Sequence, residues 1–213
     1  MRELFATYGA MLGEAIVIHM GYVLISVTIG FLLGLLLGVL LSRIPKWSAV
    51  ILPFVSIFQT IPGLVFIGVL FLWLGMVPAT AIIALSVYAI FPVLKNTYTG
   101  LLGVEARYVE AARGCGMSPV QSLLHVELPL AMPTIIAGLR MSAIYTVSWA
   151  VLTAMIGLNG LGDFVYQGVT SNNNLLILLG ALPAALLAII MGALIDLLQK
   201  RVTPRGLRKE AGK

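Results

Sequence analysis

Long uninterrupted runs of apolar residues alternate with short polar segments along the chain. Several of these runs exceed the ~18–20 residues that a helix needs to cross a hydrocarbon core about 30 Å thick. Strands of alternating polarity are missing from the pattern. The sequence therefore predicts an all-α membrane protein built as a bundle of five transmembrane helices. The expected spans are Ile16–Leu41, Ala49–Leu74, Val77–Leu94, Leu130–Ile156 and Leu175–Leu198.

The second expected span contains two prolines, Pro53 and Pro62. Each proline removes a backbone N–H donor and tends to kink or break its helix. Irregular backbone at membrane depth is tolerated where it lines a cavity or is covered by protein. We therefore expect the span to break near residues 59–63, QTIPG, and we place Gln59, Thr60 and Pro62 beside a solute pathway.

Composition and charge fit a membrane protein and suggest its orientation. Of the 213 residues, 60% are hydrophobic and 10% are charged, and the mean hydropathy is +1.06, far from the values of a soluble domain. If all five spans cross, eleven of the 13 Lys and Arg residues fall on one face, with Arg2 on the other and Arg140 inside the fourth span. By the positive-inside rule, the face that carries these eleven basic residues is cytoplasmic, which places the N-terminus outside and the C-terminus inside.

This orientation divides the chain into an extracytoplasmic segment, 1–15, a transmembrane domain, 16–199, and a basic cytoplasmic tail, 200–213. The net charge of +5 then reflects membrane topology, and we expect no nucleic-acid partner. The start of the chain lacks the pattern of a removable signal peptide, so we expect the first span to be retained. The single cysteine, Cys115, excludes an internal disulfide.

The polar loop of about residues 95–129 carries the clearest local signals. Good helix formers occupy residues 104–113, and two glycines then interrupt them. A serine, a proline and a glutamine follow in the order of an N-cap, a first-turn proline and a capping-box partner. We therefore expect a helix, a glycine turn, and a second helix that starts at Pro119 and ends before Pro129. The turn and cap residues are Gly114, Gly116, Ser118, Pro119 and Gln121.

The same loop resembles the EAA loop of the permease subunits of bacterial ABC importers, the binding-protein-dependent inner-membrane components. The resemblance rests on the spacing of EAA at 110–112, Gly116 and VELP at 126–129, with Val126 in place of the usual isoleucine. The stretches FQTIPGLVFIGVLF, YAIFPVLKNTYTGL and MIGLNGLGDFVYQGV resemble the subgroup that imports glycine betaine, choline and carnitine, within the methionine-permease-like fold. The implied ATPase-coupling residues are Glu110, Ala111, Ala112, Gly116, Met117, Ser118, Pro119, Leu128 and Pro129.

The resemblance implies a transport subunit of the bacterial cytoplasmic membrane. Its partners would be a cytoplasmic ABC ATPase dimer, a second permease subunit in a homodimer or heterodimer, and an extracytoplasmic solute-binding protein. The chain has no phosphate-binding loop, since its only Gly-Lys pair is at 212–213. We therefore expect no cofactor and no enzymatic activity in this chain, with ATP and Mg²⁺ bound by the partner ATPase.

Two further groups of residues are candidates for contact with the solute or with the binding protein. The glycine- and asparagine-rich loop 158–174 resembles a gate region, although an ordinary re-entrant turn is the alternative. Aromatic faces hold quaternary ammonium groups without a carboxylate, although aromatic residues also anchor membrane interfaces. The gate candidates are Asn159, Gly160, Leu161, Gly162 and Asp163, and the aromatic candidates are Trp73, Tyr88, Tyr98, Tyr145 and Trp149.

The remaining features leave alternatives open. A stripe of glycines at 30, 34 and 38 serves packing inside the bundle or dimerisation. Arg140 and Asp196 are expected to be structural or interfacial, and His19 and His125 stand apart from each other and from the cysteine, so no metal site is predicted. An ABC importer for an amino acid or thiol-betaine is the alternative within the fold. A stand-alone ion-coupled transporter or channel is the alternative outside it, which the sparse intramembrane charge disfavours.

Overall fold

A computed structural model describes residues 2–202, with side chains from Tyr8 onward. All of the regular elements within this range are helical. They are α1 (Arg2–Arg43), α2 (Pro45–Phe58), α3 (Gly63–Leu74), α4 (Pro78–Leu102), α5 (Ala106–Gly114), α6 (Pro119–Ser122), a π-helical turn η1 (Leu123–Glu127), α7 (Leu128–Ala150), a 3-10 segment η2 (Val151–Ile156), α8 (Leu161–Thr170) and α9 (Asn174–Val202).

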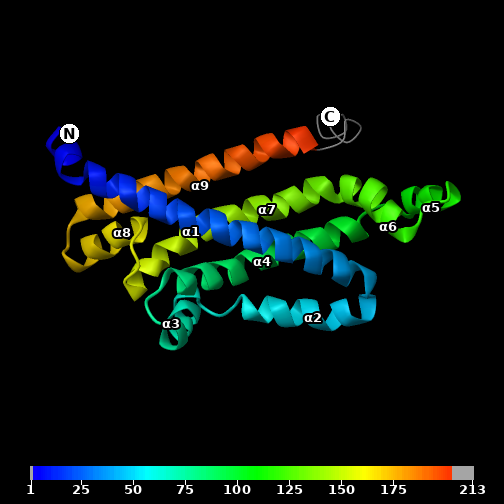
Figure 1. Cartoon of the computed structure of the whole chain (residues 1–213), viewed down its shortest axis with the longest axis horizontal. Helices are drawn as coiled ribbons and strands as arrows, with labels where there is room; N and C mark the ends of the chain where they lie inside the picture. Colours follow the sequence, from blue (N-terminus) through cyan, green and yellow to red (C-terminus); the bar gives the residue numbers. More distant parts are fainter. Residues whose placement is uncertain (1, 203–213) are drawn as a thin grey trace.

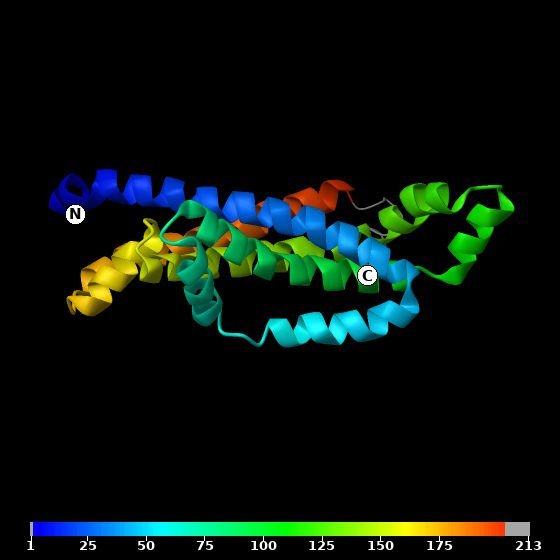
Figure 2. The ribbon, with the colours of Figure 1, turned by 60° about the horizontal axis from the view of Figure 1, so that its bottom comes forward.

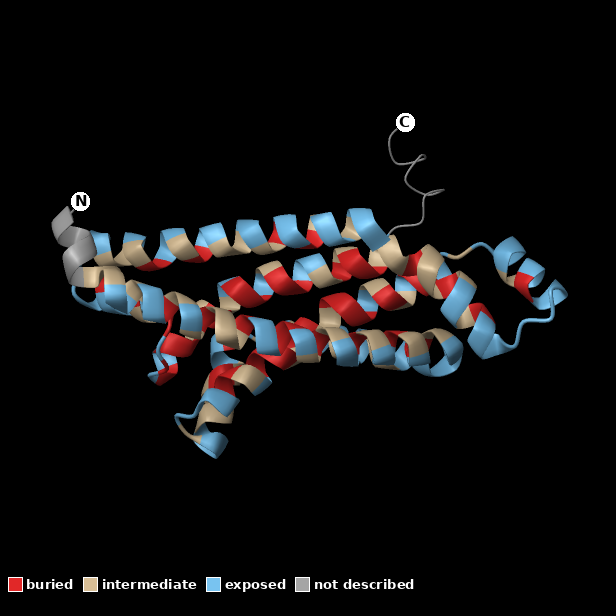
Figure 3. Ribbon diagram, turned by 45° about the horizontal axis from the view of Figure 1, so that its top comes forward, coloured by how far each residue is buried: buried red, intermediate tan, exposed pale blue. Residues whose placement is uncertain are grey.

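Helices α1, α4, α7 and α9 form an elongated bundle, and the elements between them lie at its two ends (Figure 1). The α5–α6 hairpin, the end of α1 and the end of α9 lie at one end, whereas the start of α1 and α8 lie at the other (Figures 1 and 2). Buried residues gather on the faces where these helices meet, and much of α9 is exposed (Figure 3). The exposed apolar surface of α9 is suited to contact with lipid.

Within residues 2–202, four helical segments are long and apolar enough to cross a membrane, and the bent pair α2 and α3 brings the count to as many as five. The pair bends by 88° at residues 59–62, so the predicted break in the second span is confirmed (Figure 2). Proline accounts for the break, because Pro62 has extended backbone angles and is the N-cap of α3.

The glycine stripe of α1 lies against α4. A Cβ added at Gly30 would lie 2.5 Å from the Cβ of Ala89, and one added at Gly38 would lie 2.6 Å from the Cβ of Thr97. Such distances leave room for a hydrogen atom only, so the two backbones approach as closely as small residues permit. The stripe therefore serves packing inside the bundle, and the alternative of a dimer contact is not needed to explain it.

The helices continue past some of the predicted span ends. Helix α4 continues to Leu102, so the first part of the predicted loop at 95–129 is helical. The second hairpin helix does not end before Pro129, because η1 joins α6 directly to α7. Pro129 lies in the first turn of α7, where the missing N–H is tolerated. The Leu128 N–H donates to the Leu123 carbonyl, which sustains the helix in a π-turn.

Helix α1 begins at Arg2, so its helical path extends well before the predicted span start at Ile16. Its 42 residues reach about 63 Å at a rise of about 1.5 Å per residue. This length is about twice the hydrocarbon thickness, so part of α1 projects beyond the core or crosses it at a tilt. Most of the predicted basic tail, residues 203–213, lies outside the described residues.

Candidate functional site

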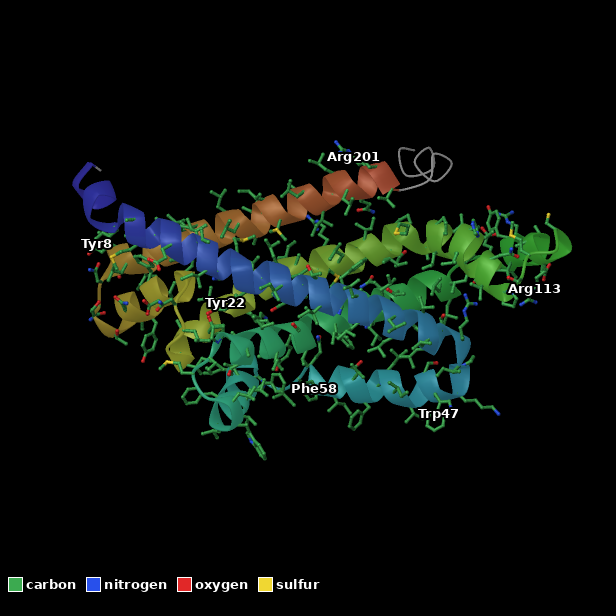
Figure 4. The ribbon with its side chains drawn as sticks, viewed as in Figure 1. Tyr8, Tyr22, Trp47, Phe58, Arg113 and Arg201 are labelled. Atoms are coloured by element: carbon green, nitrogen blue, oxygen red, sulfur yellow. The ribbon has the colours of Figure 1, made fainter. Side chains whose placement is uncertain are left out.

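Helix α5, the first helix of the hairpin between α4 and α7, ends in a Schellman motif. The Met117 N–H donates to the Ala112 carbonyl at 3.1 Å, and the Gly116 N–H donates to the Arg113 carbonyl at 2.9 Å. Gly116 has φ +79°, in the left-handed region that suits glycine because it has no Cβ. The predicted helix and glycine turn are present, with the turn at the far end of the hairpin beside the labelled Arg113 (Figure 4).

The predicted capping box at the start of α6 is also present. The Gln121 N–H donates to the Ser118 Oγ at 3.3 Å, and the Ser118 N–H donates to the Gln121 Oε1 at 2.8 Å. Pro119 occupies the first turn, where its fixed φ is pre-organised for a helix. These bonds fix the direction in which α6 leaves the turn.

The EAA residues present two kinds of surface. Glu110 and Ala111 are exposed on α5, whereas Ala112 is buried. Met117, Ser118 and Pro119 are exposed at the start of α6, and Leu128 and Pro129 are partly buried where α7 begins. The hairpin therefore offers exposed small and polar groups at its tip and is rooted in the bundle at its base. The coupling role assigned to these residues remains a prediction.

Glu127 ties the base of the hairpin to α1, and the sequence analysis missed it. Its side chain is 7% exposed and pairs with Arg43 Nη2 at 2.6 Å. The Ser122 hydroxyl donates to the other carboxylate oxygen at 3.1 Å. A buried carboxylate needs such partners because unpaired burial of a charge is costly. The signal was an acidic residue inside the apolar end of the EAA pattern, between Val126 and Leu128.

A cavity of about 210 Å³ opens between the end of α2, α4 and α7. Its wall includes three aromatic rings, an amide and a hydroxyl, and no charged side chain. The residues that line it are Gln59, Leu85, Tyr88, Tyr145, Thr146 and Trp149. Three of the predicted pathway residues, Gln59, Tyr88 and Trp149, therefore lie together, and Tyr145 joins them.

Other predicted pathway residues lie elsewhere. Tyr98 hydrogen-bonds to the Ser48 hydroxyl at 3.0 Å near the start of α2. Thr60 and Pro62 are exposed at the helix break and do not line the cavity. Trp73 is 84% exposed on α3, as an interfacial or lipid-facing ring would be.

A chain of aromatic contacts braces the helix break. The rings of Phe58 and Phe66 are 5.3 Å apart, those of Phe66 and Tyr88 5.5 Å, and those of Tyr88 and Trp149 3.9 Å between centroids. The Tyr88 hydroxyl donates to the Ile61 carbonyl at 2.8 Å, which satisfies a backbone acceptor that the broken helix leaves free. The break is thus fastened to α4 and α7 by the same residues that line the cavity.

Three of the predicted gate residues, Leu161, Gly162 and Asp163, form the first turn of a helix, α8, which the sequence analysis missed, and Gly160 is its N-cap. Leu161, Phe164 and Gly168 are buried on one face of it, and this helical spacing was the available signal. A Cβ added at Gly162 would collide with the Val151 carbonyl oxygen. Asp163 accepts a hydrogen bond from Gln167 Nε2 at 2.8 Å. The gate role remains a prediction.

Asn159, Gly160 and Asp163 lie together at a second, shallow cavity of about 140 Å³, with Glu14 of α1 opposite them. Leu161 is fully buried. The gate candidates thus occupy the end of the bundle away from the hairpin, where α1 and α8 meet (Figure 1).

An ion pair joins two of the long helices. Arg140 Nε lies 2.8 Å from Asp196 Oδ1, joining α7 to α9, so the predicted structural role of these two residues agrees with the geometry. His19 is buried, with Nε2 3.1 Å from the Val147 carbonyl oxygen. Among the described residues, no group of three or more His, Cys, Asp or Glu side chains is arranged to hold a metal ion.

The apolar bundle, the bent pair of helices and the protruding polar hairpin are the features of a multi-pass membrane protein. The chain belongs to the family described as binding-protein-dependent transport system inner membrane component, which matches residues 30–207. It is therefore a permease subunit of an ABC importer, a multi-pass protein of the cytoplasmic membrane.

Curated relatives come from osmoprotectant systems. The choline transport system permease protein OpuBB of Bacillus subtilis (strain 168) is 39% identical over 90% of this chain and 88% of its own. The glycine betaine/carnitine/choline transport system permease protein OpuCB of the same strain is 39% identical over 89% of this chain and 88% of its own. The carnitine transport permease protein OpuCB of Listeria monocytogenes is 38% identical over 90% of this chain and 88% of its own.

Solved structures share the fold. A structure of the MetNI methionine ABC transporter in an inward-facing conformation has a TM-score of 0.82 at 22% identity, covering 91% of this chain and 96% of that one. A structure of an amino acid ABC transporter with histidines has a TM-score of 0.76 at 21% identity. The match covers 92% of this chain and 96% of that one. At these identities the likeness concerns the fold alone.

Proposed function

We propose that this permease imports a compatible solute that carries a quaternary ammonium group, of the glycine betaine, choline or carnitine type. The observation that carries the proposal is the match of about nine tenths of the chain to permeases named for these solutes. The cavity wall is compatible with it, since aromatic rings attract quaternary ammonium groups without a carboxylate. Transport requires a second permease subunit, in a homodimer or a heterodimer, because one such bundle is too narrow to enclose a path.

The energy for import comes from a cytoplasmic ATPase dimer that binds ATP and Mg²⁺ and docks on the α5–α6 hairpin. The hairpin is suited to this role because its exposed tip is held in one shape by the Schellman turn and the capping box. In this scheme the hairpin faces the cytoplasm and the region 159–163 faces the binding protein. Closure of the ATPase dimer then shifts the bundle between inward-facing and outward-facing states.

The docking step is tested by Gly116→Asp. Gly116 has a positive φ, so an aspartate there strains the turn and displaces the tip. We expect the variant to insert in the membrane but to lose its ATPase on co-purification. Gly114→Asp is the matched control, because it adds the same charge at a helical position with open space around it. Wild-type amounts of ATPase bound to Gly116→Asp would refute the assignment of the turn.

The transport step is tested by uptake into proteoliposomes. The complete complex is reconstituted with the solute-binding protein, and labelled choline, glycine betaine and carnitine are offered with and without ATP on the ATPase side. We expect uptake of at least one of the three that depends on ATP. ATP-driven uptake of an amino acid, with no uptake of the three quaternary ammonium solutes, would contradict the proposed solute class. Uptake by the permease alone under an ion gradient would replace the importer mechanism with a secondary transporter.

A further inference from the structure

The aromatic cavity has the composition of a site for a permanently charged but weakly hydrated cation. Tyr88, Tyr145 and Trp149 supply rings from two helices, and Leu85 supplies apolar surface. At about 210 Å³ the cavity is smaller than the roughly 300–1,000 Å³ of drug-sized pockets, so it suits a compact solute. A cation in this cavity would be attracted mainly by the ring faces, since no carboxylate lines the wall.

The central rings are held in place before any solute arrives. The indole of Trp149 lies so close to Gly63 that a Cβ added there would be 2.8 Å from the ring. The Tyr88 ring contacts the Trp149 ring, and its hydroxyl is bonded to the backbone at the helix break. Because both side chains are already ordered, binding would cost little rotamer entropy.

We infer that this cavity is a solute-binding site of the permease itself, which selects quaternary ammonium groups by their contact with Tyr88, Tyr145 and Trp149. The inference rests on the proposed function for its solute class and adds a selection step within the membrane subunit. The absence of a carboxylate from the lining keeps the attraction modest, and a transport site must release its solute as well as bind it.

Two polar side chains that also line the cavity, Gln59 and Thr146, suit the other end of such a solute. The Gln59 amide makes one long bond of 3.4 Å to the Tyr88 carbonyl, so its N–H groups can turn toward a carboxylate or hydroxyl of the solute. The Thr146 hydroxyl donates to the Ser142 carbonyl at 2.7 Å and keeps its oxygen as an acceptor. These two groups are available to the polar head of the solute while the rings meet its ammonium methyl groups.

The site is also joined to the bend between α2 and α3. Gln59 is the C-cap of α2, and Gly63 is the first residue of α3. Movement of either half-helix would shift the cavity wall. Solute occupancy and the angle of the bend are therefore coupled.

The test is equilibrium binding of radiolabelled choline to the purified permease–ATPase complex in lipid nanodiscs, without binding protein and without nucleotide. We expect saturable binding that tetramethylammonium displaces and that ethanolamine, a primary amine of similar shape, displaces at least about tenfold less well. A strongly hydrated ammonium with N–H groups gains less from ring faces than a methylated one. Equal displacement by the two competitors would overturn the inference without any variant.

Variants assign the binding to the cavity. Trp149→Leu is expected to weaken choline binding by about fivefold or more, and Trp149→Phe by less, since a smaller ring remains. The matched control is Trp47→Leu, an exposed tryptophan at the start of α2, with unchanged affinity. Each variant is first shown to co-purify with its ATPase, and unchanged binding in Trp149→Leu would overturn the inference.

The binding and uptake experiments together test the proposed site and the proposed function independently. ATP-driven choline uptake without saturable binding by the complex would overturn the site and leave the proposed function intact. Saturable, tryptophan-dependent binding without uptake would support the site and remove the proposed function.

Discussion

The α1–α4 pair and the bent α2–α3 pair pack in opposite ways. Along α1 and α4, glycine, alanine and threonine bring two backbones together, and Val93 and Leu94 of α4 are almost completely buried. Along α2 and α3, large apolar residues face outward, as in Phe54 at 73% and Leu72 at 80% exposure. Near its break the bent pair is held by the Phe66–Tyr88 ring contact and by the hydrogen bond from the Tyr88 hydroxyl, and α3 also buries Ile67 in an apolar cluster with α4 and η2.

This difference in packing suggests which helices stay fixed during transport and which helices move. Closely packed small residues resist sliding because any displacement produces overlap. A bent pair held at its elbow can change its angle while the rest of the bundle stays fixed. The outward apolar side of α2 and α3 is left for lipid or for a second permease subunit to cover. We therefore regard α1, α4 and α7 as the fixed frame and α2–α3 as the moving part.

The largest expected effect comes from breaking the frame with Gly34→Val. A Cβ there would lie 2.7 Å from the Ile90 carbonyl oxygen and 2.8 Å from the Val93 Cβ. We expect a loss of about 3 kcal/mol or more in stability, since backbone cannot move aside cheaply. Thermal unfolding of the purified variant in detergent measures this loss of stability. Gly21→Val in the same helix is the control, because nothing lies within 4 Å of its added Cβ. Equal losses in the two variants would contradict close packing as the cause.

A smaller effect is expected from Glu127→Gln at the base of the hairpin. The change removes the charge that pairs with Arg43, and the loss should be about 1–3 kcal/mol because the carboxylate is buried while the guanidinium is half exposed. Hydrogen exchange should rise in residues 119–127. Glu105→Gln is the control, since its pair with Arg107 is exposed on both sides and contributes less than about 1 kcal/mol. Unchanged exchange in Glu127→Gln would show that the pair does not hold the hairpin.

The smallest effect is expected from Tyr88→Phe at the elbow. The variant keeps the ring contacts and loses only the hydrogen bond to the Ile61 carbonyl, at a cost of about 1 kcal/mol. Spin labels on α3 and α4 should report a broader distance distribution across the bend. Tyr166→Phe on the exposed side of α8 is the control. A narrower distribution in Tyr88→Phe would contradict the fastening role of the hydroxyl.

Local signals made much of the fold predictable. The helical class, the break at Pro62 and the capping box at Ser118 follow from hydropathy and from backbone chemistry that acts over a few residues. The glycine turn at Gly116 was predictable for the same reason, because a left-handed residue after a helix favours glycine.

Features that depend on distant partners were not predictable. The partner of Glu127 is Arg43, and a sequence gives no distance between residues so far apart. Tyr88 and Trp149 share a cavity but Tyr98 does not, and aromatic content alone does not separate them. The helix boundary at Pro129 was misjudged because a π-turn carries the helix into α7, an outcome that local proline rules do not foresee.

The central claim is that the hairpin lies on the cytoplasmic face, where an ATPase docks on it. The native cysteine, Cys115, allows a direct test of this orientation. The thiol is exposed at the hairpin turn and is the only cysteine in the chain. A membrane-impermeant maleimide should label it in inside-out vesicles stripped of ATPase, and not in intact spheroplasts, and restored ATPase should protect it. Labelling in intact spheroplasts would put the turn on the outer face and contradict the account.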